Sequence, residues 1–237
     1  MTRGFVDALA TAGTPVIAEI KLRSAVGDDL LGDRSVAEVV RAYHEAGAAC
    51  MSVVTGRWFG GNVDLLREIA ALTDVPLLQK DFITRQSQLR QAKEIGASAV
   101  LLTVGLLPVS TLHNLIGQAL GLGLTPFIEV AGADEVGAII RGQDCVVAVN
   151  NKDIKARERG AGDLDRSVHL LRAVLATGTR CAVSASGIEQ PAAGARLVDA
   201  GFTGLLVGTG LLQAHSPRAW FDEFNRHRGA SRVEETA

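Results

Sequence analysis

Short apolar runs alternate along the chain with longer segments in which hydrophobic residues recur every three or four positions. The short runs predict buried strands and the longer segments predict amphipathic helices. We expect strands to begin near Val16, Cys50, Pro76, Ala99, Thr125, Cys145, Arg180 and Gly204. We expect helices between them at residues 35–46, 63–72, 86–95, 109–120, 133–140, 167–175, 191–200 and 217–228.

This alternation is typical of a parallel sheet with crossover helices. Eight such units in 237 residues favour an α/β fold that forms one domain, a closed (β/α)8 TIM barrel over residues 1–228. An open doubly wound sheet usually has a glycine-rich fingerprint after its first strand, whereas only Gly27 follows Lys21 closely here. The polar tail at residues 229–237 is expected to be disordered.

Four predicted strands end in polar side chains that a buried strand does not normally carry. The runs are Ile17-Ala18-Glu19-Ile20-Lys21, Leu77-Leu78-Gln79-Lys80, Phe127-Ile128-Glu129 and Val147-Ala148-Val149-Asn150. Because the carboxyl ends of barrel strands meet at one mouth, these lysine, glutamate and amide side chains should converge there. Their combination predicts the acid–base site of an enzyme.

The strand ends also suggest individual roles. Lys80 is a candidate general acid, because an ammonium group in a partly desolvated site beside another lysine loses its proton more readily. Glu129 could then exchange protons on the opposite side of a substrate. Glu19 and Lys21 point to the same side of their strand, either as site residues or as a buried ion pair that fixes the packing. Asn150 either orients a substrate group or only caps the following turn.

Glycine-rich turns and aromatic residues follow other strands. Ser186-Gly187 follows the seventh strand and Gly208-Thr209-Gly210 follows the eighth, where barrels of this kind often bind phosphate; tight turns are the alternative. Phe59 and Phe82 follow the second and third strands and predict a slot for a planar ring, with loop anchoring as the alternative.

Composition narrows the class of ligand. A net charge of −2 and a pI near 6.2 give no basic surface for nucleic acid or a membrane, so a small-molecule substrate is expected. The three cysteines and five histidines lack metal-ligand spacing, and we expect no metal. Apolar runs are shorter than a membrane span and residues 1–13 lack a secretory signal, so we expect a cytoplasmic protein.

The ordered motifs at the strand ends resemble those of the indole-3-glycerol phosphate synthase family over about residues 16–224. The most specific pieces are Ile17-Ala18-Glu19-Ile20-Lys21, Phe59-Gly60-Gly61, Lys80-Asp81-Phe82, Ile128-Glu129-Val130, Val149-Asn150-Asn151-Lys152-Asp153, Ser186-Gly187-Ile188 and Val207-Gly208. The resemblance implies a lyase of tryptophan biosynthesis that needs no cofactor. It cyclises, decarboxylates and dehydrates 1-(2-carboxyphenylamino)-1-deoxyribulose 5-phosphate to indole-3-glycerol phosphate.

The resemblance also implies residue roles. Lys80 would protonate the ketone oxygen, Glu129 and Glu19 would transfer protons in the dehydration, Lys21 would hold the carboxylate or phosphate region, and Asn150 would position a hydroxyl. Substrate and phosphate contacts would come from Ser24, Phe59, Phe82, Lys152, Ser186, Gly187, Gly208 and Thr209. A monomer or weak homo-oligomer is expected.

The chain departs from the family pattern at specific positions. Ala185 stands where the family has glutamate, and Ser24-Ala25-Val26 stands where the family has Ser-Pro-Ser. Lys152 replaces a frequent arginine. The extension before the first strand is shorter than in the family. Two alternatives therefore stay open: a diverged paralogue that acts on a modified arylamino sugar phosphate in a specialised pathway, and a catalytically silent barrel that binds phosphosugars or a partner subunit. A phosphoribosyl isomerase is disfavoured. Such an enzyme usually relies on a cysteine and an aspartate as its acid–base pair, and Cys50 and Cys145 lie at the wrong ends of their strands for this role.

Overall fold

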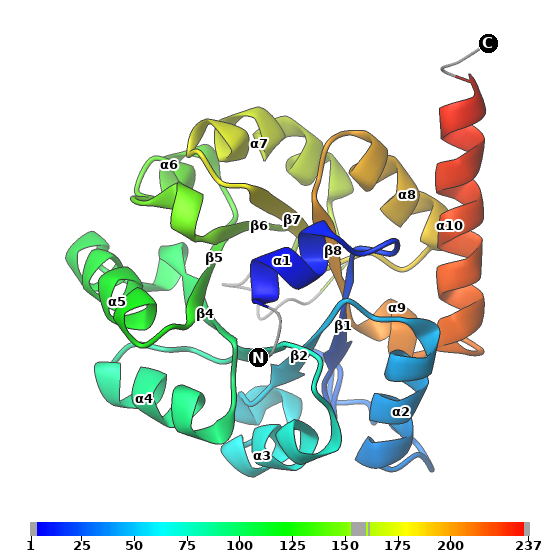
Figure 1. Cartoon of the computed structure of the whole chain (residues 1–237), viewed down its shortest axis with the longest axis horizontal. Coiled ribbons are helices and arrows are strands. Elements are labelled where there is room, and N and C mark those ends of the chain that lie inside the picture. The colour runs from blue at the N-terminus through cyan, green and yellow to red at the C-terminus, as the bar shows by residue number, and fades with distance from the viewer. Residues whose placement is uncertain (1–3, 153–159, 161, 235–237) are drawn as a thin grey trace.

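Eight parallel strands close into a barrel in the order in which they occur in the chain (Figure 1). The computed structural model describes residues 4–152, 160 and 162–234. The strands are β1 (Val16–Ile20), β2 (Cys50–Val54), β3 (Leu77–Lys80), β4 (Ala99–Thr103), β5 (Thr125–Val130), β6 (Val146–Asn150), β7 (Cys181–Ala185) and β8 (Gly204–Val207). The (β/α)8 prediction is confirmed, and each strand begins within one residue of its expected start.

Helices form the outer ring of the barrel (Figure 1). They are α2 (Val36–Ala46), α3 (Val63–Leu72), α4 (Gln86–Ile95), α5 (Val109–Gly121), α6 (Ala133–Val136), α7 (Leu164–Ala176), α8 (Pro191–Asp199) and α10 (Pro217–Glu234), with the short α9 (Thr209–Leu212) between β8 and α10. The described loops contain three 3₁₀ turns: η1 (Arg57–Phe59), η2 (Val104–Leu106) and η3 (Gly142–Asp144).

Side chains alternate between the two faces of each strand, which divides the apolar residues into two clusters. One cluster lies between the strands and the helices, where residues such as Val53, Val100 and Val147 pack. The other fills the barrel interior with Ile17, Cys50, Leu78, Ala99, Leu101, Phe127, Val146, Ala148, Cys181, Val183, Ala185 and Leu206. Residues that continue the inward alternation therefore face the mouth at the carboxyl ends of the strands.

A short helix, α1 (Phe5–Ala10), closes the other end of the barrel, and the sequence analysis missed it. Phe5, Ala8 and Leu9 belong to the interior cluster. A Cβ on Gly204 would lie 2.6 Å from Leu9 Cδ2, so the glycine at the start of β8 lets α1 approach closely. The amino-terminal end of the barrel is thus sealed by apolar contacts, and only the opposite end is free to carry polar groups.

Two helix ends differ from their predicted positions by four residues or more. The helix expected over 133–140 ends at Val136, because Gly137 follows directly and Arg141 adopts a left-handed φ of 56° before η3. Helix α10 continues to Glu234, so the backbone of residues 229–234 is helical where we expected a disordered tail; residues 235–237 lie outside the described part of the chain.

Phe5→Ala tests the docking of α1. The ring is 1% exposed and packs edge to face on Phe127, with centroids 6.3 Å apart, so its removal should lower the free energy of unfolding by about 3–5 kcal/mol. Urea denaturation measures the change. Val26→Ala, at a residue 71% exposed, is the control and should change stability by less than about 0.5 kcal/mol. A Phe5→Ala loss as small as the control would show that α1 does not dock as described.

Candidate active site

The polar strand ends converge at the carboxyl-terminal mouth of the barrel. Glu19 near the end of β1, Lys80 at the end of β3 and Glu129 on β5 are 2%, 7% and 2% exposed. Lys21 follows β1 directly, and Asn150, the last residue of β6, is completely buried. Ionised groups are rarely buried without a partner, so this concentration of charge makes the mouth the candidate site.

Glu19 lies between the two lysines. Its Oε1 atom is 2.9 Å from Lys21 Nζ, and its Oε2 atom is 3.3 Å from Lys80 Nζ. Burial alone would raise the pKa of Glu19, but the two ammonium groups lower it from the usual 4.5 to about 2. Glu19 is therefore ionised at any pH at which the protein would function, and it holds both lysines in place.

Small and aromatic neighbours shape the space around this ion pair. A Cβ on Gly208, which directly follows β8, would collide with the Glu19 carboxylate and would lie 3.1 Å from Lys21 Nζ. The glycine is therefore needed because of this close approach. On the other side, Lys21 Nζ lies 5.9 Å from the centroid of the Phe59 ring, within the range of a cation–π contact.

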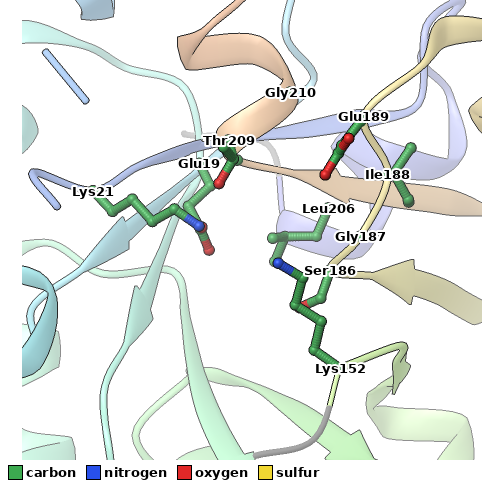
Figure 2. Close-up of a pocket in the computed structure, with 11 residues that line it drawn as sticks. Glu19, Lys21, Lys152, Ser186, Gly187, Ile188, Glu189, Leu206, Thr209 and Gly210 are labelled. Carbon is green, nitrogen blue, oxygen red and sulfur yellow. The ribbon is translucent and has the colours of Figure 1, made fainter. Parts of the chain in front are cut away.

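One pocket brings together most of the residues predicted to bind phosphate (Figure 2). Lys21 and Lys152 reach toward it from the segments that follow β1 and β6, and its wall includes backbone from the loops after β7 and β8. Its empty volume, part of which is open to solvent, is about 370 Å³. The predicted residues that line it are Glu19, Lys21, Lys152, Ser186, Gly187, Gly208 and Thr209.

A buried polar network holds the β6 and β7 ends in position. Asn151 Nδ2 donates to Ser184 Oγ at 3.0 Å and to the carbonyl oxygen of Ser186 at 3.1 Å. Ser167 Oγ donates to Asn151 Oδ1 at 2.8 Å. Ser186 adopts a left-handed φ of 67°, and Gly187 adopts a φ of 73°. This backbone conformation is unfavourable for serine, which has a side chain, and the network stabilises the turn against that cost.

Sequence reasoning missed two residues beside the predicted set. Arg166 Nη1 donates to the carbonyl oxygens of Asn150 and Lys152 at 2.9 and 3.2 Å, which fixes the backbone that carries Lys152. Glu189 places an exposed carboxylate on the wall of the pocket. Its position just after the predicted Ser186-Gly187 turn was the only signal available for Glu189, and Arg166 had none.

Two predicted contacts have other partners in the structure. Ser24 does not line the pocket; its Oγ donates to Asp28 Oδ2 at 3.0 Å and accepts from the backbone N–H of Asp28, within one loop. Phe82 packs edge to face on Trp58, with centroids 5.0 Å apart. Loop anchoring thus accounts for part of the aromatic pattern, and contact with a substrate ring stays a prediction for Phe59 and Phe82.

The described residues contain no group of three or more histidine, cysteine, aspartate or glutamate side chains placed to hold a metal ion. Cys50, Cys145 and Cys181 are buried free thiols, and burial raises the pKa of Cys145 and Cys181 to about 12. Among the helices that the structure describes, none combines the length and apolarity needed to cross a bilayer.

Comparison with known proteins identifies the family. The sequence model described as "Indole-3-glycerol phosphate synthase" matches residues 1–224. The chain belongs to the indole-3-glycerol phosphate synthase family. The indole-3-glycerol phosphate synthase of Pyrococcus furiosus is 36% identical to it, and the match covers 89% of this chain and 91% of that relative. The synthase of Polaromonas sp. is also 36% identical, and the match covers 92% of this chain and 82% of that relative.

The tryptophan biosynthesis protein TrpCD of Archaeoglobus fulgidus is 35% identical over 79% of this chain. The match spans only 34% of that longer relative. The resemblance seen in the strand-end motifs is therefore confirmed at the level of the indole-3-glycerol phosphate synthase family, by a match that includes all eight strands.

The Ala185 departure has a definite place in the mouth. Ala185 ends β7, is completely buried, and pairs in register with Asn150 on β6 and Leu206 on β8. The carboxylate that the family resemblance implies at this position would face the same space as Glu19. This chain has only a methyl group there.

Glu19→Gln tests the ion pair through the pH dependence of stability. A folded-state pKa below the unfolded value stabilises the protein above about pH 4.5, and this contribution disappears as the pH falls toward 2. At pH 7 the variant should be less stable than the wild type by on the order of 3 kcal/mol. The difference should shrink between pH 4.5 and 2, as measured by urea unfolding at several pH values. The exposed Glu68→Gln variant is the control, and a difference that does not change with pH would contradict the pairing.

Proposed function

We propose that this protein is a carbon–carbon lyase of the indole-3-glycerol phosphate synthase type, with the arylamino deoxyribulose phosphate named above as substrate. The observation that carries the proposal is the buried Lys21–Glu19–Lys80 arrangement beside a pocket with a further lysine, Lys152. This arrangement supports a proton donor at the mouth and a phosphate-binding role for the lysines of the pocket. Family membership supports the same activity.

Ring closure uses Lys80 as the general acid. The aromatic carbon that bears the carboxylate attacks the ketone carbon, and the Lys80 ammonium gives a proton to the ketone oxygen, which becomes a hydroxyl. Loss of carbon dioxide returns the electron pair to the ring and restores aromaticity. Glu19 holds Nζ of Lys80 at 3.3 Å, so the donor does not have to be ordered when the substrate binds.

The dehydration half is assigned mainly to Glu129. The nitrogen lone pair expels the hydroxyl group, which leaves as water after protonation, and loss of a proton from the carbon next to nitrogen completes the indole. Because the pKa of Glu19 is about 2, Glu19 is a poor proton carrier at neutral pH, and we assign it a positioning role. Glu129, buried on β5, is the remaining carboxylate of the predicted set.

Binding at the phosphate end is assigned to the pocket at β7 and β8. Lys21 and Lys152 supply positive charge, and the turns at Ser186-Gly187 and Gly208-Thr209 bring backbone close to the ligand because glycine adds no side chain. This leaves the aromatic end of the substrate on the far side of the barrel axis, toward β2 to β4, where Phe59 and Phe82 lie.

Ala185 favours a second candidate, a diverged paralogue that acts on a modified arylamino sugar phosphate. A buried methyl group replaces the carboxylate that the resemblance implies, while Lys21, Lys80, Glu19 and Glu129 remain. The binding and acid–base machinery would then serve a related substrate.

Incubation of the purified protein with 1-(2-carboxyphenylamino)-1-deoxyribulose 5-phosphate separates the two candidates. We expect turnover, followed as the appearance of indole fluorescence, because the proton donor and the phosphate pocket are both present. Binding of the substrate by calorimetry without any fluorescence change would contradict the synthase assignment and favour the paralogue.

Lys80→Ala tests the general acid. Turnover should fall by at least about a hundredfold, because the proposed donor of the proton to the ketone oxygen is then missing. Circular dichroism and thermal unfolding show whether the variant is folded, and Lys93→Ala, which changes an exposed lysine on α4, is the control. Activity close to that of the control would show that Lys80 is not the acid.

A further inference from the structure

Thr103, the last residue of β4, has a buried hydroxyl group without a hydrogen-bond partner among the described residues. The residue is 4% exposed. Leaving such a group unsatisfied costs free energy, so a buried hydroxyl normally bonds to protein, water or ligand. None of the assigned roles uses Thr103, which makes this hydroxyl a candidate contact for the substrate.

The strand pattern directs Thr103 into the mouth. Ala99 and Leu101, two and four residues before it, belong to the interior cluster, whereas Val100 and Leu102 face the helices. Thr103 continues the inward alternation. It pairs in register with Glu129 on β5, and so it stands beside the carboxylate assigned to the dehydration.

Position around the barrel shows which end of the substrate Thr103 would meet. In a closed barrel of eight strands in chain order, β4 lies opposite β8. The pocket assigned to phosphate is built from the ends of β1 and β8 and the loops after β6 and β7. Phe82 follows the neighbouring β3. Thr103 therefore lies on the side assigned to the aromatic ring.

Ser52 provides a comparison within the same mouth. Its Oγ atom also lacks a hydrogen-bond partner among the described residues, and it pairs in register with Glu19. However, Ser52 lies in the middle of β2, two residues before the strand ends, and so sits deeper in the barrel. The Thr103 hydroxyl is buried as well, but Thr103 is the last residue of its strand and lies at the open end of the barrel.

We propose that Thr103 determines specificity for an arylamino sugar phosphate whose ring carries a hydrogen-bonding substituent, such as a hydroxyl group, in addition to its carboxylate. This inference rests on the proposed function, because it takes the ring and phosphate ends from it. An unsubstituted ring leaves the Thr103 hydroxyl buried without a partner, whereas a ring hydroxyl satisfies it. The difference favours the substituted ligand.

Binding of analogues that cannot react tests the inference. In each analogue the ketone is reduced to an alcohol, and the ring is either unsubstituted or hydroxylated at one free position in turn. Calorimetry should show that the wild type binds one hydroxylated analogue about tenfold more tightly than the unsubstituted one. Thr103→Val, which keeps the shape but removes the hydroxyl, should abolish this preference, and Thr103→Ser should retain it.

Thr179→Val is the matched control. It removes another buried threonine hydroxyl, which donates to the carbonyl oxygen of Cys145 at 2.8 Å near the amino-terminal end of the barrel, and it should leave the preference unchanged. A wild type without preference at any ring position, or a preference that survives in Thr103→Val, overturns the inference.

A parallel turnover assay with the unreduced substrates distinguishes this failure from that of the proposed function. If the wild type forms an indole from the unsubstituted substrate but shows no preference that depends on Thr103, only the specificity role is wrong. If it neither binds nor converts any of the compounds, the proposed function fails and the inference fails with it.

Discussion

The ionised Glu19 carboxylate between two buried ammonium groups is the interaction on which the mouth of this barrel depends. Each of the three charges would be unfavourable alone in a site so little exposed, and each is offset by its neighbours at 2.9 and 3.3 Å. The arrangement also depends on Gly208, because a side chain at that position would push the Glu19 carboxylate out of its present place between the lysines. The same carboxylate therefore holds the proposed proton donor, Lys80, and makes a glycine necessary after β8.

The two ends of the barrel divide stability from chemistry. At the amino-terminal end, Phe5 and Leu9 of α1 continue the apolar interior and exclude water from the strand starts. At the carboxyl-terminal end, the same inward positions change to Glu19, Lys80, Thr103, Glu129 and Asn150. Because each strand contributes to both layers, a rigid apolar base holds polar groups in fixed directions.

Periodicity predicts most of this architecture because its causes are local. The bounds of α3 and α4 agree with the predicted ranges, since an apolar stripe defines each helix. Helix α1 has only six residues, too few for a stripe to stand out, and packing against Gly204 and Phe127 maintains it. The converging strand ends were predictable from barrel geometry. The bonds from Asn151 to Ser184, and from Arg166 to the backbone, join separate segments and leave no periodic signal.

Ala185 also affects the charge that a substrate meets, because the mouth has one negative charge fewer than the family pattern implies. Two glutamates and two lysines at the mouth cancel formally, and Lys152 adds one positive charge at the pocket. Glu189 opposes it, although solvent screens this exposed carboxylate. A substrate with phosphate and carboxylate groups thus meets little net positive charge. Its affinity must come from hydrogen bonds and ion pairs at fixed positions, and the buried network behind Ser186 supplies that rigidity.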